Sequence, residues 1–179
     1  MTPVAMTMSE REPIETSNQA GPDSAPLPWS RAHDLLAGGP LGTEAVFFLG
    51  TTRPDGRPHS AAFGAAWYDG DLYFQTGAET RKARNVIANP AVTVSARLPG
   101  IDLVFEGEAQ HVTDTETLEA VTEVWRKGGW EAEVDGDGIT APYNAPGTGP
   151  PPWLVFRITA HTVFGVATAE PYGASRWRF

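Results

Sequence analysis

The sequence contains no cysteine, and its 179 residues include only 13 Lys and Arg against 22 Asp and Glu. The lack of cysteine excludes a disulfide framework and a zinc site with cysteine ligands. The formal net charge of −9 at pH 7 argues against a general nucleic-acid binder, because affinity for phosphate backbones comes mainly from clustered Lys and Arg. Any site for an anion must therefore be local.

Long apolar runs are also missing. No segment approaches the roughly 20 apolar residues that a membrane-spanning helix needs, and the N-terminus lacks a basic region followed by an apolar one. We therefore expect a cytoplasmic protein without a membrane partner. The length favours one domain with a substantial core, since a domain of roughly 150 residues buries about 70% of its unfolded surface.

Large apolar side chains are scarce in residues 1–28, where prolines are mixed with Ser, Thr, Glu and Gly. Such a segment buries too little surface to offset the entropy of ordering it. We predict that residues 1–28 are a disordered N-terminal tail and that the folded domain spans 29–179. A short helix is expected to begin near Ser30 and to end before Gly38.

The next part of the chain alternates between short apolar runs and turn residues, which is typical of antiparallel strands. Asp69-Gly70 is a strong hairpin signal, and the Pro and Gly residues of 54–58 are typical of a reversing turn. We expect strands at 45–52, 59–68 and 72–75, joined as a meander.

Two helical segments interrupt the strands. Thr80 is placed to cap a helix over 80–88, and Thr113 opens a capping box before a second, amphipathic helix that stops at Gly128-Gly129. The other segments are predicted as strands at 91–97, 101–111, 153–159 and 161–166, with a long Gly- and Pro-rich loop over 131–152. About seven strands with inserted helices favour a small antiparallel barrel, because closure removes exposed sheet edges.

A basic triplet, Arg81, Lys82 and Arg84, stands at the expected start of the 80–88 helix. Unpaired backbone N–H groups and the positive end of the helix macrodipole favour anions there, so cations are disfavoured unless an anion compensates them. With the Thr80 hydroxyl nearby, the arrangement suits a phosphate group. The alternative is a solvated charged face in which Glu79 pairs with the cations.

Several short motifs occur in a characteristic order. Tyr73-Phe74-Gln75-Thr76 follows the Asp-Gly turn, Thr80-Arg81-Lys82-Ala83-Arg84-Asn85 comes next, and Asn89-Pro90 precedes a strand. Over residues 30–179 this order resembles the pyridoxamine 5'-phosphate oxidase-like split β-barrel superfamily. Gly56-Arg57-Pro58-His59 and the terminal Arg176-Trp177-Arg178-Phe179 look more like its flavin/deazaflavin oxidoreductase branch, in which many members use coenzyme F420. The implied fold is mainly β, a Greek-key-like antiparallel barrel of the FMN-binding split-barrel type.

The resemblance also implies a cofactor site. Thr80, Arg81 and Lys82 match the family's phosphate-binding positions, and Arg84 is one helical turn on from Thr80. The segment 59–64 matches the strand along the isoalloxazine ring, and the expected contacts there and beside it are His59, Ser60, Ala61, Phe63, Gly64, Gln75 and Thr76. Short side chains on this strand allow a flat ring to approach the backbone. The alternative is that these small residues simply fill a crowded barrel interior.

The sequence offers no convincing catalytic group or metal site. His59 is a candidate acid or base because its reference pKa lies near neutrality, but a lone histidine at a strand start is more often structural. His33, His111 and His161 show no metal-ligand spacing. No Ser/His/Asp or paired-carboxylate motif supports hydrolase chemistry. We therefore assign no catalytic side chain and no metal.

The resemblance implies an oxidoreductase in which the cofactor does the chemistry. The favoured function is an F420-dependent reductase that transfers hydride between a deazaflavin and an electron-poor small molecule, as a homodimer with cofactor sites at the interface. The many aromatic residues agree with such an interface. Two alternatives stay open: an FMN-dependent enzyme of the pyridoxamine 5'-phosphate oxidase type, and a non-catalytic binder of a flavin, haem-like or other planar ligand.

The C-terminal part departs from the pyridoxamine 5'-phosphate oxidase pattern. The His and Arg residues that bind pyridoxal phosphate in that family have no counterpart here apart from the isolated Arg176 and Arg178. Oxidation of pyridoxamine phosphate itself is therefore disfavoured. The aromatic and basic segment 176–179 is expected to pack against the domain, to cover the cofactor pocket or to dock on a partner subunit.

Overall fold

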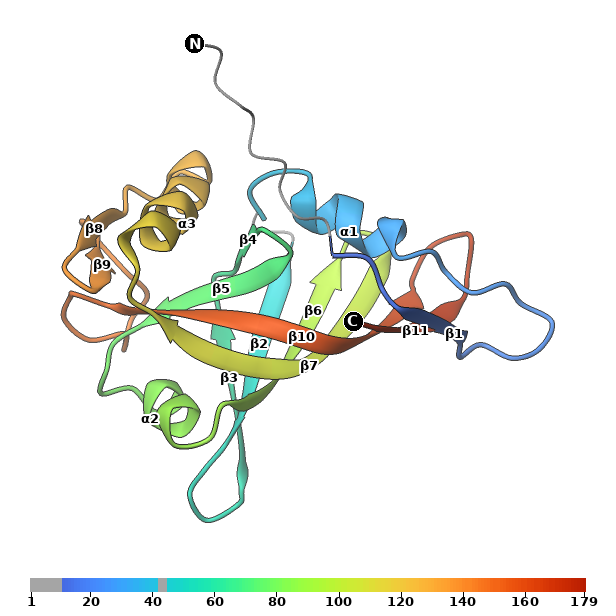
Figure 1. The fold of residues 1–179 in the computed structure, drawn as a ribbon, viewed down its shortest axis with the longest axis horizontal. Coiled ribbons are helices and arrows are strands. Elements are labelled where there is room, and N and C mark those ends of the chain that lie inside the picture. Colours follow the sequence, from blue (N-terminus) through green and yellow to red (C-terminus); the bar gives the residue numbers. More distant parts are fainter. Residues whose placement is uncertain (1–10, 42–44) are drawn as a thin grey trace, which may run out of the picture.

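One large antiparallel sheet organises the chain (Figure 1). The computed structural model describes residues 11–41 and 45–179, which form a nine-stranded sheet, a separate two-stranded hairpin and three helices. The helices are α1 (Ser30–Ala37), α2 (Arg81–Ala88) and α3 (Thr115–Lys127). The strands are β1 (Glu15–Asn18), β2 (Val46–Thr52), β3 (Pro58–Phe63), β4 (Ala66–Tyr68), β5 (Asp71–Thr76), β6 (Ala91–Leu98), β7 (Ile101–Val112), β8 (Glu133–Asp135), β9 (Gly138–Thr140), β10 (Leu154–Ala167) and β11 (Ala174–Arg178).

The sheet is curved but not closed. Its strand order is β1-β11-β10-β7-β6-β2-β3, and β5 pairs with β10 while β4 pairs with β5. Among the described residues no pairing joins β3 to β4 or β5, so β3 keeps one free edge. The predicted mainly β, antiparallel split barrel is confirmed, and the split lies between β3 and β5.

The long strand β10 holds the two parts of the sheet together. Its residues 154–158 pair with β5, and residues 162–166 pair with β11 along the same edge. On its other edge β10 pairs with β7 over almost its whole length. Figure 1 accordingly places α3 and the β8–β9 hairpin at one end of the molecule and β1 with β11 at the other.

The prediction of two separate strands in the region of β10 is wrong. The region is one strand, whose register against β7 shifts between Ala160 and Thr162. The main core receives Phe156 before this bulge and Val163 after it, so the buried positions change from even to odd numbers. In the sequence, that change of alternation looks like a strand break.

The expected strand over 59–68 is two strands, because the chain leaves the sheet at Gly64 and Ala65. The predicted meander is therefore interrupted between β3 and β4. The turn that follows is as predicted: Asp69 and Gly70 have φ values of 48° and 80°, the positive values that a two-residue hairpin turn requires. This turn sets β4 against β5.

The helices begin where local capping allows. Thr80 is the N-cap of α2, as predicted, and accepts a hydrogen bond from the Ala83 amide. The cap of α3 is Asp114, one residue beyond the predicted Thr113, and its carboxylate accepts from the Thr117 amide. The predicted loop over 131–152 contains the β8–β9 hairpin, so it is not entirely irregular.

The expectation that residues 1–28 form a disordered tail is wrong for the part that the structure describes. Residues 15–18 form β1, which pairs with β11. Glu15 sits between two cations of β11, with Arg178 at 3.0 Å and Arg176 at 3.4 Å. A polar segment is ordered here because another strand supplies its hydrogen bonds and counter-charges. Residues 1–10 lie outside the described part of the chain.

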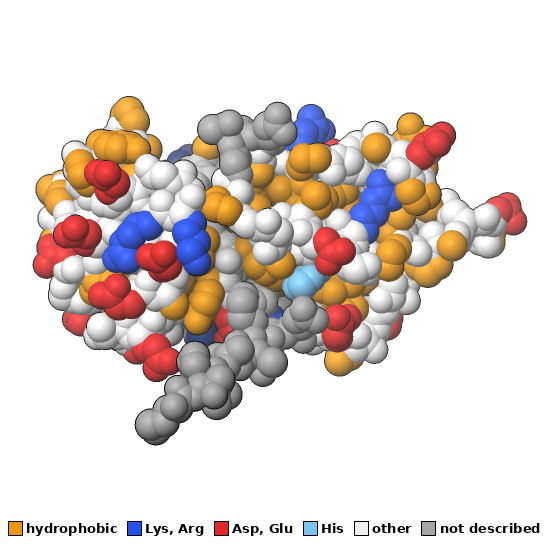
Figure 2. Space-filling view, turned by 90° about the horizontal axis from the view of Figure 1, so that it is seen from above, with side chains coloured by type: hydrophobic (Ala, Val, Ile, Leu, Met, Phe, Trp, Pro, Cys, Tyr) orange, Lys and Arg blue, Asp and Glu red, His pale blue; other side chains and the backbone are white. Residues whose placement is uncertain are grey.

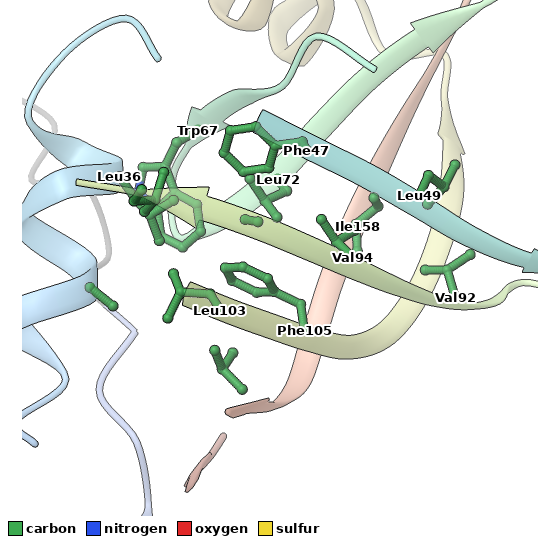
Figure 3. Close-up of a cluster of buried hydrophobic side chains, with 14 of the residues drawn as sticks. Leu36, Phe47, Leu49, Trp67, Leu72, Val92, Val94, Leu103, Phe105 and Ile158 are labelled. Atoms are coloured by element: carbon green, nitrogen blue, oxygen red, sulfur yellow. The ribbon is translucent and has the colours of Figure 1, made fainter. Parts of the chain in front are cut away.

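The main core lies inside the curved sheet, where α1 covers one end. Figure 3 shows Leu36 of α1 beside Trp67, with Phe105 of β7 further into the same cluster. A second cluster around Val121 and Trp153 fixes α3 to the outer side of β5 and β10. In Figure 2 acidic and basic side chains are interspersed over the end that carries α3. The described residues include no helix that is both long and apolar enough to cross a membrane.

Candidate functional site

The turn from β5 into α2 forms one end of the candidate site. Thr80 Oγ1 accepts from the Ala83 amide at 3.3 Å, donates to the Gly77 carbonyl at 2.8 Å and lies 2.9 Å from Thr76 Oγ1. A threonine has one hydroxyl proton, so Thr76 is the donor between the two threonines. The predicted Thr76 and Thr80 are thus brought together. The Thr80 hydroxyl has its proton engaged within the turn, and its contact with a phosphate stays a prediction.

The loop before β10 packs against this turn. A Cβ atom on Gly77 would lie 2.0 Å from the Thr148 carbonyl oxygen, so only glycine permits the approach. Gln75 and Asn144 exchange two hydrogen bonds between their amide groups, at 3.0 and 2.9 Å. The predicted site residue Gln75 is therefore partnered by a loop residue that the sequence analysis did not single out.

Two of the three predicted cations carry unbalanced charge. Arg84 forms an ion pair with Glu79, with 2.7 Å between Nη2 and Oε2, whereas Arg81 and Lys82 have no carboxylate partner in the described part of the chain. Lys82 is half-buried, and burial lowers its pKa. Cations at the positive end of a helix raise its affinity for an anion. Pairing with Glu79 therefore holds for Arg84, whereas Arg81 is exposed without a carboxylate partner among the described residues, and its contact with a phosphate stays a prediction.

His59, at the start of β3, lies close enough to these cations to feel their charge. Burial lowers its pKa, and the positive charges of Arg53, Arg81 and Lys82 lower it further. Its Nδ1 lies 3.4 Å from Thr51 Oγ1. The imidazole is therefore neutral near pH 7. Arg53, in the turn after β2, is a cation that the sequence analysis missed. Its position in the Pro- and Gly-rich turn before β3 could have indicated that it lies near His59 at the start of that strand.

Asn85 ties α2 to the β2–β3 pair. Its side chain is fully buried, and its Nδ2 donates to Thr51 Oγ1 at 2.9 Å. Its Oδ1 has no hydrogen-bond partner among the described residues, which is costly for a buried acceptor. Sequence reasoning missed Asn85. The available signal was a polar residue between Ala83 and Val86, which are also buried on this helix.

The predicted residues of β3 lie on both of its faces. Phe63 points into the core, where its ring centroid is 5.8 Å from that of Phe47 and 5.7 Å from that of Phe74. His59 and Ala61 share this face because side chains alternate along a strand. Ser60 lies on the other face and lines an open hollow of about 610 Å³ that also reaches His59.

The far end of β3 is apolar. Phe63 and Gly64 line a pocket of about 280 Å³ together with Trp125 and Trp130. Gly64 is about 16 Å along the strand from His59, at ~3.3 Å per residue. The predicted site residues therefore divide into a cationic end around α2 and an apolar end beside α3, with the free edge of β3 between them. Their contacts with a cofactor stay predictions.

The side chains at the cationic end suit the binding of an anion. Among the described residues no group of three or more His, Cys, Asp or Glu is placed to hold a metal ion. The pKa of His59 is lowered, and its neighbours are cations and a threonine. Such a site can hold an anion at one end and a flat apolar group at the other, while a bound cofactor supplies the chemistry.

This combination, an open antiparallel barrel with a free strand edge beside a cationic helix start, is the fold on which the class of the protein rests. A family model described as pyridoxamine 5'-phosphate oxidase matches residues 40–167, which is more than half of the chain. The chain belongs to the pyridoxamine 5'-phosphate oxidase family, as its motifs predicted. No curated protein sequence matches it.

Solved structures with the same fold carry different names. A pyridoxamine 5'-phosphate oxidase-related, FMN binding protein from Nostoc punctiforme is 18% identical, with a TM-score of 0.55 over 85% of this chain and 90% of that one. A protein named F420 reductase is 24% identical, with a TM-score of 0.51 over 73% and 94%. A heme binding protein from Mycobacterium smegmatis is 12% identical, with a TM-score of 0.55 over 79% and 54%. At these low sequence identities, the structural matches show that the fold is shared and do not identify the ligand.

Proposed function

We propose that the protein binds coenzyme F420 and acts as a reductase that passes hydride to an electron-poor small molecule. The observation that carries the proposal is the pair of unbalanced cations, Arg81 and Lys82, at the start of α2 beside His59 and the free edge of β3. A phosphate-bearing cofactor supplies the anion that this end of the site lacks. The fold shared with a protein named F420 reductase supports the choice.

The residues present fit such a cofactor. Arg81, Lys82 and Arg53 are placed to hold the phosphate, with the backbone N–H groups of the first turn of α2. The unpaired edge of β3 offers backbone N–H and C=O groups to the polar edge of a flat ring. When bound in its reduced form, the deazaflavin would supply a hydride to the acceptor and would itself be left oxidised, and a proton from solvent would complete the reduction of the acceptor.

The chain contributes binding, orientation and exclusion of water. His59, neutral near pH 7, adds a hydrogen-bonding group at the cationic end without adding charge. The Gln75–Asn144 amide pair holds the loop before β10 against the site, and that loop shields the end of β5 from solvent. No side chain has to act as an obligatory acid or base.

A parallel titration of the purified protein with coenzyme F420, FMN and hemin tests the proposal, with ring fluorescence and absorbance as the readouts. We expect tight binding of coenzyme F420 and weak binding of the other two. Tight binding of FMN with weak binding of coenzyme F420 favours an FMN-dependent oxidoreductase, which the Nostoc neighbour supports. Binding of hemin alone, or of a flavin that no reductant reduces, favours a non-catalytic binding protein and contradicts the reductase.

We also propose that the functional unit is a homodimer. Phe48 and Val104 point outward from the sheet with 45% and 39% of their surface exposed. Both are level with Ser95 of β6, so they form one row across β2, β6 and β7. A second copy of the chain would cover both side chains, and apolar side chains are enriched in the buried centre of interfaces between identical chains; Phe48 also lines the hollow that reaches His59.

Sedimentation velocity tests the homodimer. We expect the mass of two chains for the unmodified protein and of one chain for Phe48→Glu. The control is Tyr172→Glu, which changes a residue with 67% exposure near the C-terminus and is expected to leave the dimer intact. A single-chain mass for the unmodified protein contradicts the proposal.

A further inference from the structure

The apolar pocket at the far end of β3 differs in chemistry from the rest of the site. Its volume is about 280 Å³, and it opens where the chain leaves the sheet at Gly64. Phe47 and Phe63 form its wall on the sheet side, and Trp125 and Trp130 form the opposite wall. None of its described lining residues is charged.

Neighbouring pockets around α3 do not share this property. The pocket between α1 and α3 is lined in part by Glu123 and Lys127. The hollow below the end of α3 is lined in part by Arg126, Glu131 and Glu133. A charged ligand has counter-charges in those places, whereas the described lining of the apolar pocket offers an anion none, and placing an unpaired charge against apolar surface is unfavourable.

The walls of the apolar pocket are rich in aromatic rings. The ring centroids of Phe47 and Phe63 are 5.8 Å apart, and those of Trp125 and Trp130 are 5.9 Å apart at an interplanar angle of 86°. The indole N–H of Trp130 already donates to the Tyr143 carbonyl at 2.8 Å. The ring of Trp130 also stacks on Trp153, with 5.9 Å between the centroids, so the part of its ring that lines the pocket is apolar, and aromatic surfaces of this kind favour stacked or edge-on aromatic partners.

We infer that this pocket is the binding site for the hydride acceptor, and that it selects uncharged, flat, mainly apolar molecules over anionic ones. The inference rests on the proposed function in one respect: Phe63 and Gly64 belong both to the pocket and to the strand expected to lie along the cofactor ring. The cationic end takes the charged part of the cofactor, and the apolar end is left for a neutral acceptor.

Two fluorescent probes with the same anilinonaphthalene ring system test the selectivity without any cofactor. N-phenyl-1-naphthylamine is uncharged, and 8-anilinonaphthalene-1-sulfonate carries a sulfonate. Titrated into the cofactor-free Arg81→Ala/Lys82→Ala protein, in which the cations that could hold a sulfonate are removed, the uncharged probe is expected to bind with a Kd at least tenfold lower than the sulfonate. Equal affinities, or tighter binding of the sulfonate, overturn the inference.

A pair of leucine variants locates the probe. A Cβ atom on Gly64 meets no other atom within 4 Å, and the residue is outside the left-handed region of φ, so Gly64→Leu fills the pocket without backbone strain. We expect it to weaken binding of the uncharged probe at least tenfold. Ala120→Leu adds bulk to the neighbouring pocket and is expected to leave the affinity unchanged. Equal effects of the two variants overturn the inference, provided that their melting temperatures match the unmodified protein.

Adding a positive charge beside the pocket should shift its preference toward the anionic probe, which gives a second test that does not depend on Gly64. Val124 lies on α3 at the rim of the pocket. Val124→Lys brings a cation to the rim and is expected to strengthen binding of the sulfonate probe at least fivefold relative to the uncharged one. Val124→Met, of similar length and without charge, is expected to leave the ratio of the two affinities unchanged. An unchanged ratio in Val124→Lys contradicts the inference.

Calorimetry separates failure of the inference from failure of the proposed function. The uncharged probe is titrated into protein saturated with coenzyme F420, and we expect a Kd within about threefold of that for the free protein. Displacement of the probe by the cofactor overturns the inference, because the pocket then belongs to the cofactor ring. If coenzyme F420 does not bind while the probe binds selectively, the proposed function fails and the selectivity of the pocket stands.

Discussion

Removing the two unbalanced cations tests the anion site directly. Arg81→Ala and Lys82→Ala each delete a charge that lacks a carboxylate partner among the described residues. A hydrogen bond to a charged group contributes about 1.5–3 kcal/mol, which corresponds to about 10- to 150-fold in Kd. We expect Lys82→Ala near the upper end of this range because Lys82 is half-buried. Arg81 is exposed, so solvent screening places Arg81→Ala near the lower end.

The matched control is Arg84→Ala on the same helix. Arg84 is already paired with Glu79, so its loss is expected to change the Kd by less than about threefold, since exposed ion pairs contribute about 0–1 kcal/mol. The assay is a fluorescence titration with the cofactor at low and at high salt, where the difference between variants should shrink. Unchanged affinity in both Arg81→Ala and Lys82→Ala, or an equal loss in Arg84→Ala, refutes the reasoning.

The same substitutions have an opposite effect on the cofactor-free protein. Cations at the N-terminus of a helix are disfavoured by its macrodipole, so each alanine variant is expected to be more stable by about 0.3–1 kcal/mol. Urea unfolding measures this difference. Weaker cofactor binding together with higher stability shows that the cations serve the ligand, whereas losses of both indicate a structural role.

Three further predictions concern single residues. The pKa of His59 is lowered from 6.5 in the folded state. Its contribution to stability is therefore present above pH 6.5 and is lost as the pH falls toward the lowered pKa. His59→Gln should remove this pH dependence, so that the unfolding free energy measured against pH becomes flatter in this range. Gly77→Ala should cost about 1–3 kcal/mol in urea unfolding, since its Cβ overlaps the Thr148 carbonyl, and a neutral result contradicts the close approach. Trp177→Ala should cost about 3–5 kcal/mol, measured in the same way, because Trp177 is fully buried and donates to the Leu27 carbonyl.

Elements with local causes were predictable from the sequence. Asp69-Gly70 fixes its hairpin turn through two positive φ values, and Thr80 caps α2 through its own side chain. In both cases the residues that determine the structure are within a few positions of one another. The cationic end of the site was predictable for the same reason, because Arg81 and Lys82 are adjacent in the sequence.

Features with distant causes were not predictable. β1 is ordered because β11, far along the chain, supplies its hydrogen bonds and two arginines for Glu15. Gln75 meets Asn144 only because the loop before β10 returns to the end of β5. Asn85 reaches Thr51 only when α2 packs on β2. Composition and spacing carry no record of such pairs, since each partner looks like an ordinary polar residue in its own segment.

The bulge in β10 makes the number of residues in this strand as important as their types. The extra residue between Ala160 and Thr162 allows Phe156 and Val163 to face the same core, although an unbroken strand would place an even and an odd position on opposite faces. Deleting His161 would therefore remove the bulge and leave Val163 facing the core. Inserting one further residue after the bulge would instead turn Val163 outward and bring Phe164 inward, and the edge that receives β11 would be inverted. Insertions that the Pro-rich loop before β10 can absorb are thus forbidden a few residues later.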